Sequence, residues 1–153
     1  TGKSHDPEMW KEMTGAVAWG YDRHPFPGLE HRAKRPPHVF DLVTMNFVLN
    51  ILATERERAE ALLDASSFVA PGGLLWVSTR SKSHLDKQGE KKGWAKTTEG
   101  AWISSPSKKT VQFGMDEEDI VELAQRSGLS GFTHNRVQGR PGSETGCALF
   151  RRR

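Results

Sequence analysis

The chain has 153 residues, of which 35% are hydrophobic and 27% charged, an ordinary composition for one soluble domain with a core of its own. It has no apolar run long enough to span a bilayer and no signal peptide, so the sequence predicts neither a membrane span nor secretion. The single cysteine, Cys147, excludes an internal disulfide and is typical of a cytoplasmic protein. The net charge of +3 permits a polyanionic partner without requiring one.

The N-terminal part of the chain is predicted to contain a helix, a strand and a long loop. An Asp-Pro pair at the start and a glycine at the end predict a helix over 7–14. The apolar run AVAWGYD, residues 16–22, favours a buried strand that ends on Asp22. Four prolines make the following segment, 23–37, a loop.

Two apolar segments further along predict neighbouring parallel strands. Phe40–Thr44 and Leu74–Ser78 are rich in residues that favour strands, and we expect both to be buried on both faces. Between them the pattern predicts a helix over 54–70, which the prolyl-glycyl-glycine turn at 71–73 is expected to stop. The apolar face of this helix is expected to hold Ala59, Leu62, Leu63 and Ser66.

The last third of the chain is predicted to contain an insert, a helix and a hairpin. Residues 82–109 form a polar, Lys-rich and Trp-containing insert that we expect to be irregular. A helix is predicted over 116–128, and two strands at 131–139 and 145–153 are expected to pair antiparallel. This order of elements predicts an α/β fold in one domain over 1–153, with a mostly parallel sheet, helices on both faces and a C-terminal antiparallel hairpin.

The central segment of the chain resembles a known family. HVFDLVTMNFVLNIL, the helix after it and the turn FVAPGGLLWVSTR resemble the second half of the class I S-adenosylmethionine-dependent methyltransferases, which have a Rossmann-like sheet. The resemblance implies a methyltransferase with S-adenosylmethionine as its cofactor. It also implies that the family's first strand and the start of its glycine turn are missing from the chain. Residues 93–123 are similar, more narrowly, to methyltransferases found beside DNA phosphorothioation genes.

The resemblance implies a set of cofactor-binding residues. Gly2 would be the last glycine of the turn after the first strand, although TGKS also resembles the end of a phosphate-binding P-loop. Asp22, with Arg23 beside it, would hold the ribose hydroxyls of the cofactor, and a loop aspartate that caps a turn is the alternative. Asn46 and Phe47 would lie where the methyl donor is held, and a turn-forming asparagine is the alternative.

The insert is the predicted substrate-binding segment. Lysines attract phosphates and exposed tryptophans stack on bases, so we expect a nucleic acid or nucleotide acceptor. The predicted contact residues are Lys91, Lys92, Trp94 and Trp102. A solvated insert whose tryptophans cover the sheet edge is the alternative, as are a small-molecule acceptor and a catalytically silent binding module. The sequence assigns no catalytic residue, and the spacing of His and Cys predicts no metal site.

Overall fold

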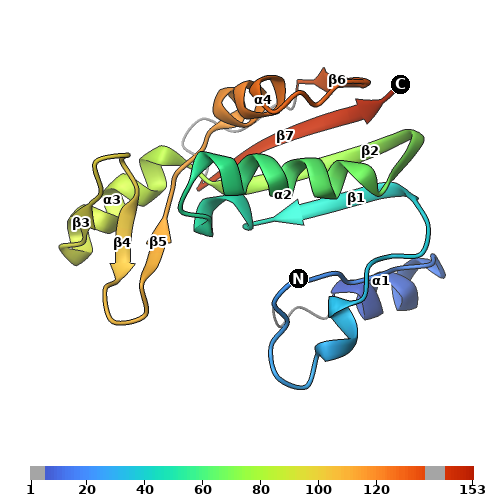
Figure 1. The fold of residues 1–153 in the computed structure, drawn as a ribbon, viewed down its shortest axis with the longest axis horizontal. Coiled ribbons are helices and arrows are strands. Elements are labelled where there is room, and N and C mark those ends of the chain that lie inside the picture. Colours follow the sequence, from blue (N-terminus) through green and yellow to red (C-terminus); the bar gives the residue numbers. More distant parts are fainter. Residues whose placement is uncertain (1–5, 137–143) are drawn as a thin grey trace. The chain divides into compact units, whose positions relative to one another are not determined.

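The computed structural model describes residues 6–136 and 144–153 (Figure 1). The chain forms two compact units, one that ends at Val39 and one that comprises Phe40–Arg153, and each is described by itself. Within the described residues, no helix combines the length and the apolar character that a membrane crossing requires. The expected single domain stays a prediction.

The first unit contains the predicted helix but not the predicted strand. Helix α1 spans Asp6–Thr14, as expected. No strand forms over 16–22, and this prediction is wrong. A strand needs a ladder partner for its backbone groups, whereas the backbone N–H of Asp22 donates instead to the carbonyl of Arg32, 3.0 Å away in the 3-10 helix Glu30–Ala33.

The second unit is built on a four-stranded sheet with the order β1-β2-β7-β6. The strands are β1 Phe40–Asn46, β2 Val69–Arg80, β6 Phe132–Asn135 and β7 Thr145–Arg152. Strands β1 and β2 are parallel, whereas β7 is antiparallel to both of its neighbours, β2 and β6. Three strands therefore run in one direction, which confirms the mostly parallel sheet and the antiparallel C-terminal hairpin.

Two helices, α2 Glu55–Ser67 and α4 Glu117–Arg126, pack on one face of this sheet (Figure 1). Alternate residues of the strands point towards them because side chains alternate across a strand. The core between sheet and helices includes Leu62, Leu75, Val77, Ile120 and Phe150. Both helices are close to the predicted ranges, but Leu63 of α2 is exposed, contrary to expectation.

The turn PGG does not stop α2. The helix ends at Ser67, where the backbone N–H of its C-terminal capping residue Phe68 donates to the carbonyl of Ala65 at 3.2 Å, and 71–73 already belong to β2. A Cβ atom on Gly73 would lie 3.0 Å from the carbonyl oxygen of Asp41. The glycine is therefore needed where β2 passes close to the backbone of β1.

Strand β1 is less buried than the sequence predicts. Leu42 is 46% exposed, and Asp41 and Thr44 are exposed as well, whereas Leu75 and Val77 of β2 are fully buried. In the described sheet β1 is one of the two edge strands, with β2 beside it on one side only, and α2 and α4 cover one face. The prediction of burial on both faces is therefore wrong for β1.

The insert is folded rather than irregular. It forms helix α3 and a three-stranded antiparallel sheet in the order β3-β4-β5. The elements are α3 Lys82–Lys92, β3 Ala95–Lys96, β4 Trp102–Ser105 and β5 Thr110–Gln112. The helix begins where the Ser81 hydroxyl accepts a hydrogen bond from the backbone N–H of His84, and it ends at Gly93, which has a φ of 63°.

Candidate functional site

The carboxyl ends of β1 and β2 lie side by side, and polar groups of the two strands form hydrogen bonds with each other there. Asn46 is paired with Ser78 in the register of the two strands. The Ser78 hydroxyl donates to Asn46 Oδ1 at 2.8 Å, and the backbone N–H of Phe47 donates to the Ser78 carbonyl at 2.8 Å. Ligands of parallel α/β sheets bind at this edge, so the sheet edge is a candidate site.

Phe47 has an unusual backbone conformation at this edge. Its φ of 56° lies in the left-handed region, which a bulky side chain rarely adopts. The residue is 39% exposed, and the Arg80 guanidinium lies 4.8 Å from the ring centroid. Strained backbone of this kind clusters at ligand-binding and active sites, because the surrounding structure must hold it in place.

Two charged side chains and a histidine complete this edge. Glu144 Oε2 lies 3.9 Å from Arg80 Nη1, and Glu144 Oε1 lies 3.7 Å from His84 Nδ1 in the first turn of α3. The carbonyl of Glu144 also accepts from the backbone N–H of Ser81 at 3.0 Å. We call the six residues Asn46, Phe47, Ser78, Arg80, His84 and Glu144 the β1–β2 corner.

Sequence reasoning found two of these six residues and missed four. A general rule could have found three of the missed residues, because ligands of parallel sheets bind at the carboxyl ends of the strands. Such positions, at or just after the end of a predicted strand, are held by Ser78, Arg80 and His84. Glu144 has no such signal. It reaches the corner because β7 pairs antiparallel with β2, which places Thr145 beside Arg80.

The other predicted cofactor residues are not part of the corner as described. Asp22 and Arg23 belong to the first unit, and Gly2 lies outside the described residues. Asp22 Oδ1 accepts a hydrogen bond of 2.9 Å from the backbone N–H of His24. One carboxylate oxygen thus caps a turn, as in the alternative interpretation of this residue, and the cofactor role of Asp22 stays a prediction.

Among the predicted substrate residues, Trp102 is buried rather than exposed. Only 8% of it is accessible, and its indole N–H donates to Asp86 Oδ1 at 3.0 Å. The Lys96 ammonium lies 4.5 Å from the ring centroid and also pairs with Asp86 at 2.8 Å. Trp102 therefore builds the core of the insert, and the expectation that a base could stack on it is wrong.

The other three predicted substrate residues lie at the C-terminal end of α3. Trp94 is half-buried, and the Lys92 ammonium lies 5.0 Å from its ring centroid. Lys91 is exposed, and no hydrogen bond or ion pair is found for its side chain within the described residues. The contact of these three residues with substrate stays a prediction.

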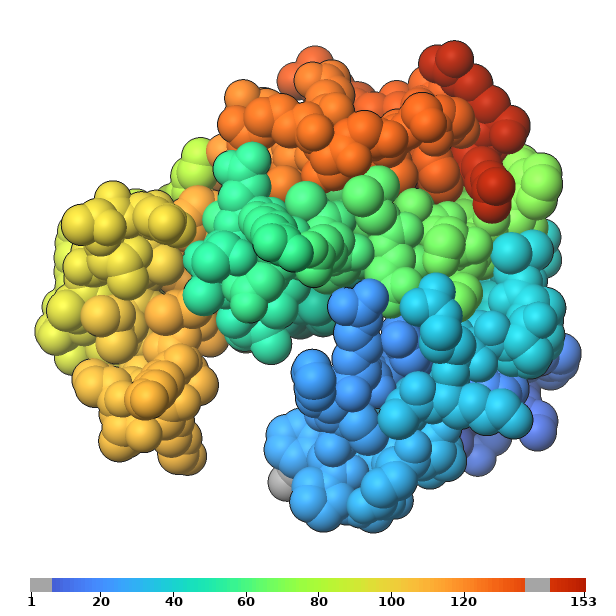
Figure 2. All heavy atoms as spheres, viewed as in Figure 1, coloured from blue at the N-terminus to red at the C-terminus, as the bar shows by residue number. Residues whose placement is uncertain are grey.

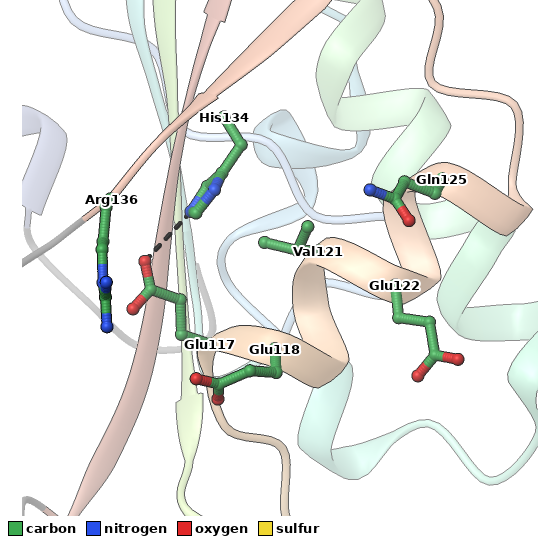
Figure 3. Close-up of a pocket in the computed structure, with 7 residues that line it drawn as sticks. All are labelled: Glu117, Glu118, Val121, Glu122, Gln125, His134 and Arg136. Carbon is green, nitrogen blue, oxygen red and sulfur yellow. Dashed lines mark hydrogen bonds and ion pairs between the residues drawn. The ribbon is translucent and has the colours of Figure 1, made fainter.

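A shallow groove of about 250 Å³ lies between α4 and β6 (Figure 3). Three glutamates line it, and one of them, Glu117, lies 3.0 Å from His134 Nε2. Glu117 and Glu118 belong to the first turn of α4, where acidic side chains stabilise the positive end of the helix dipole. The acidic lining therefore has a structural explanation, and the groove is a weaker candidate than the β1–β2 corner.

No protein-family model and no curated protein sequence matches the chain. Among solved structures, the magnesium protoporphyrin IX methyltransferase of Synechocystis PCC 6803, with bound S-adenosylhomocysteine, superimposes with a TM-score of 0.53 and 13% identity over 97% of this chain and 57% of that one. An S-adenosylmethionine-dependent methyltransferase of Clostridium acetobutylicum matches with a TM-score of 0.51 and 12% identity over 77% of this chain and 60% of the other.

A third structure, from Rhodobacter sphaeroides, carries the name of zinc-dependent alcohol dehydrogenases. It matches with a TM-score of 0.51 and 18% identity over 74% of this chain and 59% of the other. The chain thus spans somewhat more than half the length of each of these proteins. At such identities the likeness concerns the fold alone, since one fold hosts many activities. The chain has the Rossmann-like α/β fold found in S-adenosylmethionine-dependent methyltransferases.

Proposed function

We propose that the β1–β2 corner is the methyl-transfer site of an S-adenosylmethionine-dependent methyltransferase. The observation that carries the proposal is the hydrogen-bonded pair of Asn46 and Ser78 at the adjacent carboxyl ends of two parallel strands. The left-handed backbone of Phe47 next to this pair supports the proposal, because strained conformations of this kind cluster at active sites. The fold is compatible with it.

The residues of the corner fit the chemistry of this cofactor. Asn46 is exposed and its Oδ1 is occupied by Ser78, so its amide N–H groups remain to donate to the carboxylate of the methionine part. The resemblance assigns the ribose hydroxyls to Asp22, and this role stays a prediction. The bound cofactor supplies a methyl group on a sulfonium, and the protein contributes mainly by positioning the acceptor.

For the acceptor we propose a nucleic acid or a nucleotide. Residues 82–109 contain seven lysines and three acidic residues, a formal charge of +4 against +3 for the whole chain. This concentration of positive charge next to the sheet edge favours a substrate with phosphates. The narrower similarity of residues 93–123 to methyltransferases found beside DNA phosphorothioation genes points the same way. A small-molecule acceptor is the alternative.

The charged insert also supports a second candidate function, a methyltransferase-like module that binds nucleic acid without transferring a methyl group. The silent module and a methyltransferase that acts on nucleic acid both require the insert to bind a polyanion, but only the methyltransferase requires a bound cofactor. Cofactor binding is therefore the measurement that separates them.

The deciding experiment is a calorimetric titration of the full chain with S-adenosylhomocysteine. We expect the parent to bind and Asn46→Ala to bind roughly 10- to 150-fold more weakly, since a hydrogen bond to a charged group contributes roughly 1.5–3 kcal/mol. Asn135→Ala, which removes an asparagine from β6, is the matched control and should bind like the parent. An absence of heat with the parent would reject the methyltransferase and leave the silent module.

A further inference from the structure

We propose that the β4–β5 hairpin binds the major groove of B-form duplex DNA and that Lys108 and Lys109 at its tip contact the phosphate backbone. The hairpin consists of residues 102–112. This inference rests on the nucleic-acid part of the proposed function and adds the element that makes the contact and the form of nucleic acid that it fits.

The shape of the hairpin suits a groove. It projects from the rest of the second unit, and every residue from Pro106 to Thr110 is exposed (Figures 1 and 2). The four residues of β4 extend over about 13 Å at ~3.3 Å per residue. The major groove of B-form DNA is about 8.5 Å deep and about 12 Å wide, and it admits a two-stranded β-ribbon. The hairpin is therefore long enough to lie across the groove and to place its tip at the phosphates on the groove's edge.

The charged side chains of the hairpin are all positive. Between Gly100 and Met115 the chain has no acidic residue. Within the described residues, the side chains of Lys108 and Lys109 make no ion pair, whereas Lys82 and Lys96 of the same insert are paired with Asp119 and Asp86. In the sequence, the two lysines are flanked by hydroxyl-bearing residues at positions 104, 105, 107 and 110. Lysines together with Ser and Thr hydroxyls are the groups that contact DNA phosphates.

The hairpin is held firmly at its base. The backbone N–H of Phe113 donates to the carbonyl of Asn50 at 2.7 Å, and the Asn50 side chain donates to Gln112 Oε1 at 2.8 Å. The Arg58 guanidinium lies 4.1 Å from the Phe113 ring centroid. Asn50 is buried in the short 3-10 helix Leu49–Ile51, which follows the end of β1. These contacts hold the base of the hairpin against the segment that follows β1.

The same structure disfavours other nucleic acids. Single strands bind to exposed aromatic rings, but Trp102 is buried and Trp94 is half-buried beside Lys92. The major groove of A-form RNA is too narrow for side chains to enter. The hairpin therefore fits a DNA duplex better than a single strand or an RNA duplex.

The test is a fluorescence titration at several salt concentrations with a DNA duplex, its single strand and the RNA duplex of the same sequence. The variant combines Lys108→Ala with Lys109→Gly, since Lys109 has a φ of 52° that glycine adopts without strain. The control variant combines Lys11→Ala with Lys34→Ala, which removes two exposed lysines from the first unit.

We expect the parent to bind the DNA duplex at least tenfold more tightly than the other two. Removing two phosphate contacts should reduce the slope of log affinity against log salt concentration by about 1.8. If parent and variant bind equally well at about 1 M salt, the variant should bind roughly 60-fold more weakly at about 0.1 M salt. The control should keep the parent's slope. The proposal is overturned if the hairpin variant behaves like the parent or like the control, if RNA or the single strand binds as tightly as duplex DNA, or if the parent binds no DNA at low salt.

Titration with S-adenosylhomocysteine in the same preparations separates the two proposals. A parent that binds DNA through the hairpin but not S-adenosylhomocysteine rejects methyl transfer and retains the hairpin. A parent that binds S-adenosylhomocysteine, with a hairpin variant that leaves DNA binding unchanged, rejects the hairpin and retains methyl transfer.

Discussion

Gly89 of α3 faces the indole of Trp102 so closely that a methyl group would overlap the ring. In an ordinary helix interior, replacing glycine by alanine stabilises by roughly 0.5–1 kcal/mol. Here the helix and β4 can approach each other only because position 89 has no side chain. The pair therefore reverses the usual sign of this substitution.

We expect Gly89→Ala to destabilise the chain by about 1–3 kcal/mol, the usual cost of overpacking. Urea unfolding followed by tryptophan fluorescence is the measurement. Gln88→Ala, one position away on the same helix, should be close to neutral. A stabilised Gly89→Ala variant would show that α3 and β4 do not pack as described.

Asp86 should make the stability of the insert depend on pH. The Lys96 ammonium beside it lowers the pKa of the Asp86 carboxyl, and the hydrogen bond from Trp102 adds to the effect. A lowered folded-state pKa contributes stability that is fully present above the unfolded value, near 3.9, and is lost as the pH falls through the folded value.

Asp86→Asn should therefore melt at a lower temperature than the parent at pH 7, and the two melting curves should converge near pH 2. Glu90→Gln on the same helix is the matched control and should follow the parent at both pH values. If Asp86→Asn and the parent differ equally at the two pH values, the ion pair with Lys96 is not the cause.

Asp22 is expected to bind the cofactor ribose. Asp22→Ala should weaken the binding of S-adenosylhomocysteine by about 1.5–3 kcal/mol, because it removes a charged acceptor of hydrogen bonds. Asp22→Asn retains an oxygen for the His24 N–H but not the charge, so it separates turn capping from ribose binding. Calorimetry that gives the parent's affinity for both variants would remove Asp22 from the site.

Val43 and Leu42 are neighbours in β1 that point to opposite faces of the sheet. Val43 packs against the core, whereas Leu42 is 46% exposed. Val43→Asp should abolish the cooperative thermal melt, because an unpaired carboxylate in an apolar interior is costly. Leu42→Asp should retain a cooperative melt. Equal effects of the two substitutions on calorimetric unfolding would contradict the described burial of β1.

The sequence predicted the elements whose local pattern agrees with their tertiary surroundings. Helix α4 has acids in its first turn and an apolar stripe that includes Ile120 and Leu123, and both signals are present in the printed residues. Strands β1 and β2 were identified by their apolar runs, and their parallel pairing by the helix between them.

The errors arose where long-range contacts decide the structure. The run at 16–22 is apolar enough for a strand but has no ladder partner in the described structure. The folded structure of the insert depends on the packing of Trp102 against Gly89. These two residues are far apart in the sequence, and no helical or strand periodicity relates them. The corner was found only in part for the same reason, since Glu144 joins it through the antiparallel pairing of β7.

The position of β7 has a consequence for the synthesis of this protein. It follows both β2 and β6 in the chain, yet it lies between these two strands, which have no ladder with each other. While residues 145–152 are still inside the ribosome, β2 and β6 have no strand between them to pair with. Exposed strand edges of this kind promote misassembly. The main sheet can therefore close only after β7 has been synthesised, and until then the edges of β2 and β6 that β7 will cover are open to other strands.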